Sequence, residues 1–170
     1  MKRFLFTILF IVAIPAAAFA AERFPALVSV EFSPTGSPQS VILNELSKAQ
    51  RSVEVAAYGI SSPQIVKELV ELKKSGVDVA VYCDRNARKW SKWQIRKLRR
   101  ARIFVRIKKS KLLMHNKYMI IDGSEVITGS YNFSKAAATE DNNIVVIRDS
   151  PEIVAKFEAD FQRMLRESGR

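Results

Sequence analysis

The stretch "LLMHNKYMIIDGSEVITGSYNF" (residues 112–133) combines two strand-like runs with a cluster of polar side chains. It contains His115, the only histidine of the 170-residue chain, and Lys117 follows two positions later. Successive side chains of a strand alternate between its faces, so we expect these two side chains to point the same way. Asp122 has the opposite parity, and we expect it to support the pair rather than to join it on that face.

A second strand pattern, "EVIT" (residues 125–128), follows after a short turn that contains a glycine, and the two runs predict a β-hairpin. This hairpin would return Ser130 and Asn132 to the neighbourhood of His115 and Lys117. Such a set of side chains suits phosphoryl transfer, because an imidazole can attack phosphorus or move protons near neutral pH. Lys117 and Asn132 would hold the non-bridging oxygens as charge develops. With one histidine and no carboxylate cluster, we expect no metal ion and no other cofactor.

The spacing H-x-K-x4-D-x6-G-S-x-N matches the signature of the phospholipase D superfamily. The chain resembles this superfamily, and the stretches "VEFSPTGS", "AAYGISSPQIVKELVELKKSGVDVAVYCD" and "TGSYNFSKAA" are similar to its small single-motif bacterial endonucleases. The resemblance implies a mixed α/β fold and a metal-independent, two-step reaction. One histidine would attack the phosphodiester to form a phosphohistidine, and a second would protonate the leaving oxygen and then activate water. The catalytic residues that the resemblance implies are His115, Lys117, Asp122, Ser130 and Asn132.

The chain departs from the superfamily pattern after this motif. The superfamily commonly continues with N-x-E-N, in which the glutamate orients the nucleophilic histidine. Here the stretch reads "TEDNNIVVI" (residues 139–147), and the glutamate position falls on Asn142. Glu140 or Asp141 would have to replace that carboxylate. The alternative is a non-catalytic nucleic-acid-binding module in which the asparagine has disabled the site.

The rest of the chain alternates between strand and helix patterns. Strands are predicted at residues 26–32, 52–60, 77–83, 102–107, 117–122, 125–128 and 143–149. Helices are predicted from Pro38 to about Gln50, from Pro63 to Gly76, over residues 91–101, and from Pro151 to about Arg166. This order predicts an α/β fold, with a mixed, largely parallel β-sheet flanked by helices on both faces.

The N-terminus has the pattern of a secretory signal peptide. A short basic start precedes an apolar run, and Ala18-Phe19-Ala20 matches a small-x-small cleavage site. We therefore expect residues 1–20 to be a signal peptide and residues 21–170 to be a single domain, in the periplasm or secreted. The protein would then have no stable association with membranes. The alternative is an uncleaved membrane anchor, since the apolar run is near the length that spans a bilayer.

The charge pattern indicates a polyanionic partner. The chain has a net charge of +11, and residues 85–121 contain fourteen Lys and Arg and no acid. Cations of this kind neutralise phosphates, and tryptophans among them can stack on bases. The predicted substrate-binding residues are Arg96, Lys97, Arg99, Arg100 and Trp93. The alternatives are that the charge only keeps the protein soluble and that both tryptophans, Trp90 and Trp93, pack under the helix.

These observations favour a phosphodiesterase that cleaves nucleic acid, DNA or RNA, with little sequence preference. A phospholipid substrate is the alternative with the same chemistry, but no apolar entry surface is evident in the sequence. The two-step reaction needs two imidazoles, and the chain supplies one. We therefore expect a symmetric homodimer with one composite active site, in which each chain contributes His115.

Overall fold

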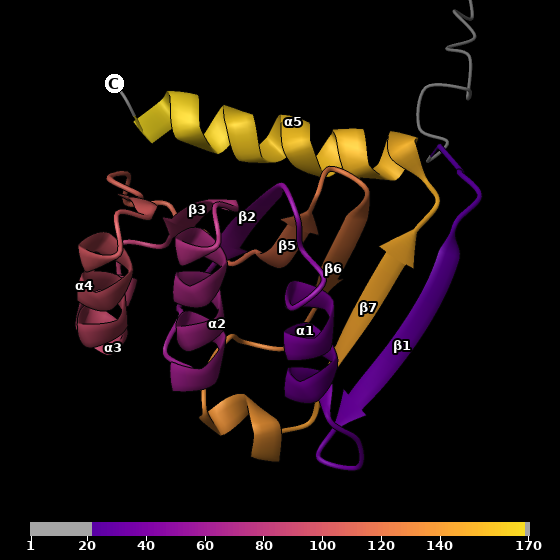
Figure 1. Ribbon diagram of the computed structural model, residues 1–170, viewed down its shortest axis with the longest axis horizontal. Coiled ribbons are helices and arrows are strands. Elements are labelled where there is room, and N and C mark those ends of the chain that lie inside the picture. The colour runs from indigo at the N-terminus through magenta and orange to yellow at the C-terminus, as the bar shows by residue number, and fades with distance from the viewer. Residues whose placement is uncertain (1–21, 169–170) are drawn as a thin grey trace, which may run out of the picture.

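One seven-stranded sheet organises the computed structural model, which describes residues 22–168 (Figure 1). The predicted signal peptide lies outside the described residues. The strand order is β1-β7-β6-β5-β2-β3-β4. The strands are β1 (Leu27–Ser33), β2 (Ser52–Ala57), β3 (Asp78–Cys83), β4 (Phe104–Ile107), β5 (Lys117–Ile121), β6 (Glu125–Gly129) and β7 (Asn142–Arg148). The helices are α1 (Pro38–Leu46), α2 (Pro63–Lys74), α3 (Ala87–Trp90), α4 (Lys92–Arg100), the 3-10 helix η2 (Ala136–Thr139) and α5 (Pro151–Ser168).

Helices cover both faces of the sheet. Figure 1 shows α1, α2 and α4 side by side over one face, while α5 runs across the strands. The larger apolar core lies under α1, α2 and α4 and includes Ile42, Leu69 and Leu98. A smaller core lies under α5 and includes Tyr82 and Phe161. The central strands are therefore buried on both faces, because helices cover each face of the sheet.

The sequence signals at the ends of α2 act as predicted. The Ser62 hydroxyl accepts a hydrogen bond from the Ile65 N–H (3.4 Å), and Pro63 occupies the first turn. Gly76 follows the helix with φ +99°, a conformation that side chains other than glycine rarely adopt. No helix within residues 22–168 combines the length and the apolar character needed to cross a bilayer.

The mixed α/β sheet with helices on both faces is confirmed, but the prediction that parallel pairing dominates is wrong. Only β2–β3 and β3–β4 pair in parallel, whereas four other pairings are antiparallel. Parallel neighbours need a long crossover connection, and only α2 and the α3–α4 segment supply one between paired strands. The strands β5, β6 and β7 are joined by connections that contain no α-helix, and they pair antiparallel.

Helix α1 ends at Leu46, four residues before the predicted end. The Lys48 and Ala49 N–H groups donate to carbonyls three residues back, to Glu45 and Leu46, so the α-helical pattern is already broken there. The Gln50 N–H then donates to the Asp122 carboxylate (2.9 Å). A second difference is α3, a one-turn helix that the sequence patterns do not predict. It lies directly after β3 and carries Trp90 at its end.

Candidate active site

The β5–β6 hairpin brings the two halves of the motif together. Tyr118 pairs with Thr128, so the same register sets Gly129 opposite Lys117. Gly129 has φ +149°, and a Cβ added there would lie 2.2 Å from the Asn143 carbonyl oxygen. A glycine is therefore required for β6 to end against β7 at this point. The hairpin predicted from the sequence is confirmed, and Ser130 leaves it at the end where His115 enters.

His115 and Lys117 lie on the same side of the chain, as their spacing predicts. The ring of Tyr58 packs edge-on against His115 with centroids 4.7 Å apart, and Lys117 Nζ lies 5.4 Å from the same ring centroid. Lys117 Nζ also donates to the His115 carbonyl oxygen (2.8 Å). Lys117 is buried, and burial lowers the pKa of its ammonium. His115 is exposed, so the imidazole is open to a substrate while the cation beside it is partly desolvated.

Tyr58 is a site residue that the sequence analysis did not single out. It follows β2 directly and is held there by its N–H, which donates to the Asn116 carbonyl oxygen (3.0 Å). Its other neighbour is Trp90, whose ring centroid lies 5.1 Å away. The available signal was its position at the carboxyl end of a predicted buried strand, where open α/β sheets commonly place ligands.

Ser130 and Asn132 follow the end of β6, and neither lines the cavity of His115 or forms a hydrogen bond with His115 or Lys117 within residues 22–168. The Ser130 hydroxyl donates to Asn143 Oδ1 (2.9 Å) and accepts from the Asn143 N–H (3.0 Å). It therefore ties the end of β6 to β7. Asn132 Oδ1 is buried and receives no hydrogen bond from the described residues. Buried polar atoms are usually paired, so this amide oxygen retains the capacity to accept a hydrogen bond from a substrate or from a neighbouring side chain.

The structure places Asp122 away from the other motif residues, which corrects its assignment to the catalytic set. It lies beyond the far end of β5, about 17 Å along the strand from Lys117 at 3.3 Å per residue. Its carboxylate accepts the N–H groups of Gln50, Arg51 and Ser52, the shortest at 2.7 Å. Burial disfavours its charge, but these backbone hydrogen bonds outweigh burial and lower the pKa of Asp122. Asp122 stabilises the β5–β6 turn and the start of β2.

The residues considered as replacements for the orienting glutamate do not contact the imidazole. Asn142 Nδ2 donates to Glu140 Oε2 (3.4 Å) and to the Ala137 carbonyl oxygen (3.4 Å). Asp141 is exposed. Within residues 22–168, no hydrogen bond joins His115 to any of the three.

Asp160 of α5 shares a cavity with His115 and Lys117, unlike Glu140, Asp141 and Asn142. A cavity of about 500 Å³ is lined by His115 and Lys117 from one side and by Lys156, Phe157 and Asp160 of α5 from the other.

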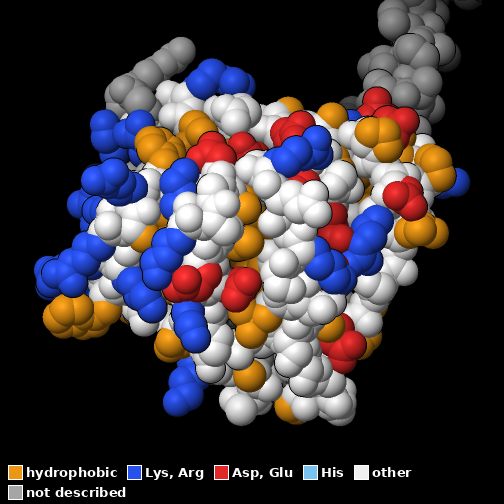
Figure 2. All heavy atoms as spheres, in the orientation of Figure 1, with side chains coloured by type: hydrophobic (Ala, Val, Ile, Leu, Met, Phe, Trp, Pro, Cys, Tyr) orange, Lys and Arg blue, Asp and Glu red, His pale blue; other side chains and the backbone are white. Residues whose placement is uncertain are grey.

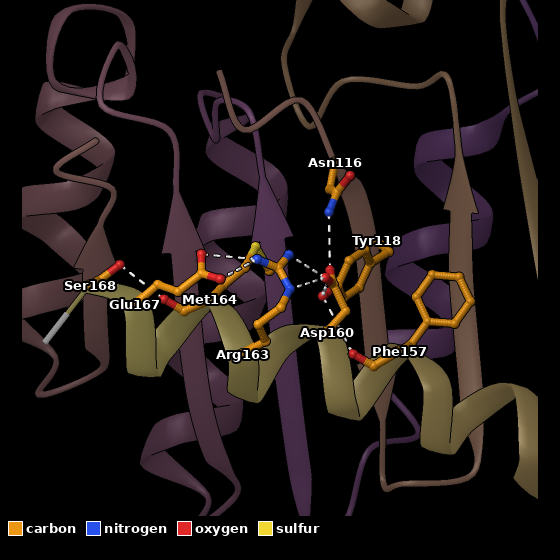
Figure 3. Close-up of polar contacts among 8 residues, drawn as sticks. All are labelled: Asn116, Tyr118, Phe157, Asp160, Arg163, Met164, Glu167 and Ser168. Atoms are coloured by element: carbon orange, nitrogen blue, oxygen red, sulfur yellow. Dashed lines mark hydrogen bonds and ion pairs between the residues drawn. The ribbon is translucent and has the colours of Figure 1, made fainter. Parts of the chain in front are cut away.

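Figure 3 shows how this carboxylate is held. Asp160 Oδ2 accepts from Asn116 Nδ2 (3.2 Å) and from the Tyr118 hydroxyl (3.1 Å). Arg163 pairs with Asp160 and with Glu167 (2.9 Å). Burial, followed by the Asp160 charge, raises the pKa of the Tyr118 hydroxyl, which therefore stays protonated as a donor. Sequence reasoning missed Asp160, because 44 residues separate it from Asn116 and no local pattern links them.

The predicted substrate-binding side chains gather on one surface. Figure 2 shows Lys and Arg side chains over α3 and α4, at the left of the view. All five are exposed: Trp93, Arg96, Lys97, Arg99 and Arg100. None of the Lys and Arg between residues 85 and 111 forms an ion pair within the described part of the chain. The interpretation that the tryptophans pack under the helix is wrong, since Trp90 is 54% exposed and Trp93 is 70% exposed.

No group of three His, Cys, Asp or Glu side chains within residues 22–168 is arranged to hold a metal ion. The residues that surround His115 instead offer an ammonium, an amide and hydroxyl groups. These can stabilise negative charge on a phosphate and orient an attacking imidazole. The arrangement suits nucleophilic displacement at phosphorus.

The chain is similar in sequence to a known protein family and to several curated proteins. The family described as "Cardiolipin synthase, PLD-like domain" matches residues 42–165. A phospholipase D from Rickettsia conorii is 37% identical over 123 residues, which cover 72% of this chain and 62% of the relative. A mitochondrial cardiolipin hydrolase from Chlamydomonas reinhardtii is 31% identical over 134 residues, covering 79% and 60%. The chain thus spans about three fifths of the length of these curated relatives.

Solved structures match over more of the chain. Nuc from Salmonella typhimurium, described as a phospholipase D family member, superposes with a TM-score of 0.79 at 32% identity. The match covers 84% of this chain and 96% of Nuc. NucT from Helicobacter pylori gives a TM-score of 0.73 over 84% and 98% of the two chains. At 23% identity, NucT supports the shared fold alone.

Proposed function

The chain belongs to the phospholipase D superfamily, and on that premise we propose that it is a phosphodiesterase that cleaves nucleic acid through a phosphohistidine. One observation carries the choice of substrate. The His115 cavity lies on the same molecule as a surface of unpaired Lys and Arg on α3 and α4. A bound polyanion would neutralise the mutual repulsion of these cations, and each neutralised phosphate would release counterions, which favours binding. The likeness to Nuc, a phospholipase D family member, supports the chemistry of this superfamily at His115.

The proposed chemistry has two displacements at phosphorus. An imidazole nitrogen of His115 attacks, so a P–N bond forms as the P–O bond to the leaving strand breaks. A second, protonated imidazole gives its proton to the leaving oxygen. The same imidazole then takes a proton from water, whose oxygen attacks phosphorus and breaks the P–N bond. The Lys117 ammonium and the Asn132 amide stabilise the charge that develops on the non-bridging oxygens.

The second imidazole comes from a second copy of the chain. His115 is the only histidine, and it is exposed beside an open cavity, so a symmetric partner can approach it. A two-fold axis beside β5 would bring both His115 side chains to one phosphate. We expect light scattering to show a dimer at assay concentration. A monomer that turns over at the full rate would contradict the composite site. Mixing His115→Ala and Lys117→Ala chains should not restore a wild-type site, because each mixed site lacks one His and one Lys.

A phospholipid is the second candidate substrate, and one structural observation favours it. Leu112 and Leu113, directly before Met114 and His115, are 74% and 58% exposed. Exposed leucines beside a catalytic residue can enter the interface of a bilayer. The relatives named phospholipase D and mitochondrial cardiolipin hydrolase point the same way.

A paired assay separates the candidates. Nicking of a supercoiled plasmid and release of headgroup from phosphatidylcholine and cardiolipin vesicles are measured with the same preparation, each with excess EDTA. We expect plasmid nicking that survives EDTA and is lost in His115→Ala, with no headgroup release. The matched control is Lys67→Ala, which removes an exposed lysine of α2. Headgroup release without nicking would select the phospholipid. DNA binding without either reaction would select the non-catalytic module.

A periplasmic or secreted location stays a prediction from the N-terminal pattern. We propose it because a nuclease without sequence preference is compatible with a cell only where it does not meet the genome. Fractionation of cells that express the full chain, followed by mass measurement, tests both the location and cleavage after Ala20. Recovery of the uncleaved chain in the membrane fraction would contradict it.

A further inference from the structure

A row of aromatic rings leads from the catalytic histidine to the molecular surface. Tyr58 meets His115 edge-on at 4.7 Å, and Trp90 meets Tyr58 edge-on at 5.1 Å. Trp90 remains 54% exposed, so about half of this large side chain stays in water. An aromatic ring normally contributes most when it is buried. The exposed ring at the end of this row is therefore available to a ligand.

The fold holds Trp90 in place relative to His115. The buried Ser91 hydroxyl, next to Trp90, accepts the Ile60 N–H (3.0 Å). Buried Asp84 accepts the Asn86 N–H (2.8 Å) at the start of α3 through one oxygen. Through the other it accepts the Met114 N–H (2.9 Å), next to His115. These bonds anchor α3 both to the segment that carries Tyr58 and to the segment that carries the nucleophile.

A basic groove lies on α3 and α4, and two of its lining residues, Arg88 and Lys92, flank Trp90 in the sequence. It is a hollow of about 790 Å³ whose floor includes Ile95 and Ile107. Its basic lining residues are Arg88, Lys92, Arg96, Arg99 and Arg100. A smaller hollow of about 470 Å³ lies beside α3 and shares Arg88 with the groove. Among residues 22–168, no carboxylate lines either hollow, so the described lining presents only positive charge to a ligand.

We propose that Tyr58, Trp90 and the basic groove form a binding path for an unpaired polynucleotide strand whose scissile phosphodiester lies at His115. The inference rests on the proposed function and specifies its substrate class. An unpaired strand offers both base faces and phosphates, and proteins bind it by combining aromatic stacking with a cationic groove. In a duplex the bases stack on one another and their faces are not available. The exposed ring beside the cleavage site therefore selects single strands.

Trp90, rather than Trp93, is the principal stacking residue of this path. The guanidinium of Arg96 lies 5.2 Å from the centre of the Trp93 ring and occupies one face of that ring. No cation within residues 22–168 lies over the Trp90 ring, and Trp90 is the tryptophan that contacts Tyr58, the neighbour of His115. Trp93 lies on α4, one helix further from the catalytic strand.

Binding measurements on an uncleaving protein test the path. In a His115→Asn background, fluorescence anisotropy compares an oligothymidylate, an abasic strand with the same number of phosphates, and a duplex. We expect the oligothymidylate to bind at least tenfold more tightly than the abasic strand. Trp90→Ala should weaken oligothymidylate binding about 5- to 150-fold, with abasic binding changed less than twofold. Trp90→Phe should keep most of the preference, because a π face remains.

The matched control is Phe104→Ala, which removes another exposed aromatic ring. Phe104 is 48% exposed, and its neighbour Val105 packs against the core under α4. Alternation along β4 therefore puts Phe104 on the opposite face of the sheet. The control should bind all three ligands as the parent does.

Three results would overturn the proposed path. These are equal affinity for the oligothymidylate and the abasic strand, a preference that persists in Trp90→Ala, or tighter binding of the duplex. Because these measurements need no cleavage, they fail independently of the proposed function. Plasmid nicking without base-dependent binding overturns the path alone. Base-dependent binding by a protein that nicks no DNA supports the path and overturns the nuclease.

Discussion

The ring of Tyr58 lies edge-on against the imidazole of His115, with centroids 4.7 Å apart and planes inclined by 65°. The same ring lies 5.4 Å from Lys117 Nζ, so one side chain contacts both functional groups of the motif. Tyr58 is only partly buried, and it lies directly after β2 rather than in the hairpin. The orientation of the nucleophile therefore depends on the neighbouring strand.

Two substitutions of Tyr58 should show whether its ring, which orients His115, or its hydroxyl group matters for turnover. Tyr58→Phe keeps the ring and should retain turnover within about threefold, whereas Tyr58→Ala frees the imidazole and should lower kcat by about ten- to a hundredfold. Steady-state cleavage of a short oligonucleotide measures both. Equal losses in the two variants would show that the hydroxyl, and not the ring, is the functional group.

His115→Ala should lower cleavage by about 10³-fold or more, because it removes both the nucleophile and the acid of a composite site. The fold should be unaffected, since His115 is exposed and its ring meets Tyr58 edge-on. Thermal unfolding within about 2 °C of wild type serves as the control. Near wild-type turnover in this variant would refute the mechanism.

Lys117 should impose an alkaline limit on activity. Burial lowers its pKa from the ordinary lysine value, and the neutral amine does not stabilise a phosphate. Cleavage should therefore fall as pH rises through a value below about 10.5. The residual activity of Lys117→Arg should lack this limb, because a guanidinium stays charged. An unchanged pH profile in Lys117→Arg would assign the limb to another group.

The same burial predicts that Lys117 costs stability at neutral pH. With a lowered folded-state pKa, the unfolded chain binds the proton more tightly, so the stability of the wild type rises with pH across the window between the two pKa values. Lys117→Met should be inactive yet at least as stable as wild type at pH 7. The difference in Tm should shrink as pH approaches about 10.5. A Met variant that is less stable at pH 7 would contradict this.

Asp122 should act on stability and not on turnover. Asp122→Ala leaves three backbone N–H groups without their acceptor and should cost about 2 kcal/mol. This corresponds to a fall in Tm of about 4 to 8 °C for a domain of this size. Asp122→Asn should lose less, because asparagine tolerates the φ of +54° at this position. In both variants, kcat per folded molecule should stay within about twofold of wild type.

The low pKa of Asp122 also predicts how this contribution depends on pH. A carboxylate whose folded-state pKa is depressed contributes stability above its unfolded pKa and loses it as pH falls through the folded value. The difference in Tm between wild type and Asp122→Asn should therefore have its largest value at pH 7. This difference should become smaller as the pH falls below about 3.9. A difference that does not change with pH would show that the charge makes no contribution.

Asp160 should matter more to catalysis than the carboxylates after the motif. It lines the cavity with His115 and holds Asn116 beside it, whereas Glu140 bonds to Asn142 and Asp141 is exposed. Asp160→Asn should lower kcat about tenfold with KM little changed, by loosening the start of β5. Glu140→Gln and Asp141→Asn should stay within about twofold. The reverse order would identify one of these two as the group that orients His115.

Much of the fold follows from local sequence. The hairpin around Gly123 and the start of α2 at Pro63 depend on residues close together in the chain, through turn geometry, strand alternation and capping. The same hairpin places Gly129 opposite Lys117, so local sequence was sufficient to predict that the end of β6 returns to the start of β5.

The tertiary structure alone decided what surrounds that site. The parallel or antiparallel sense of each strand pair depends on how the connections cross the sheet. The Asp122 carboxylate meets the Ser52 N–H across 70 positions, and Asp160 meets Asn116 across 44. The row from His115 through Tyr58 to Trp90 joins three separate segments. The hydrophobic periodicity of the sequence predicts on which face of its own helix or strand a side chain lies. The partner on another element is set by strand order and helix docking, which no local pattern encodes.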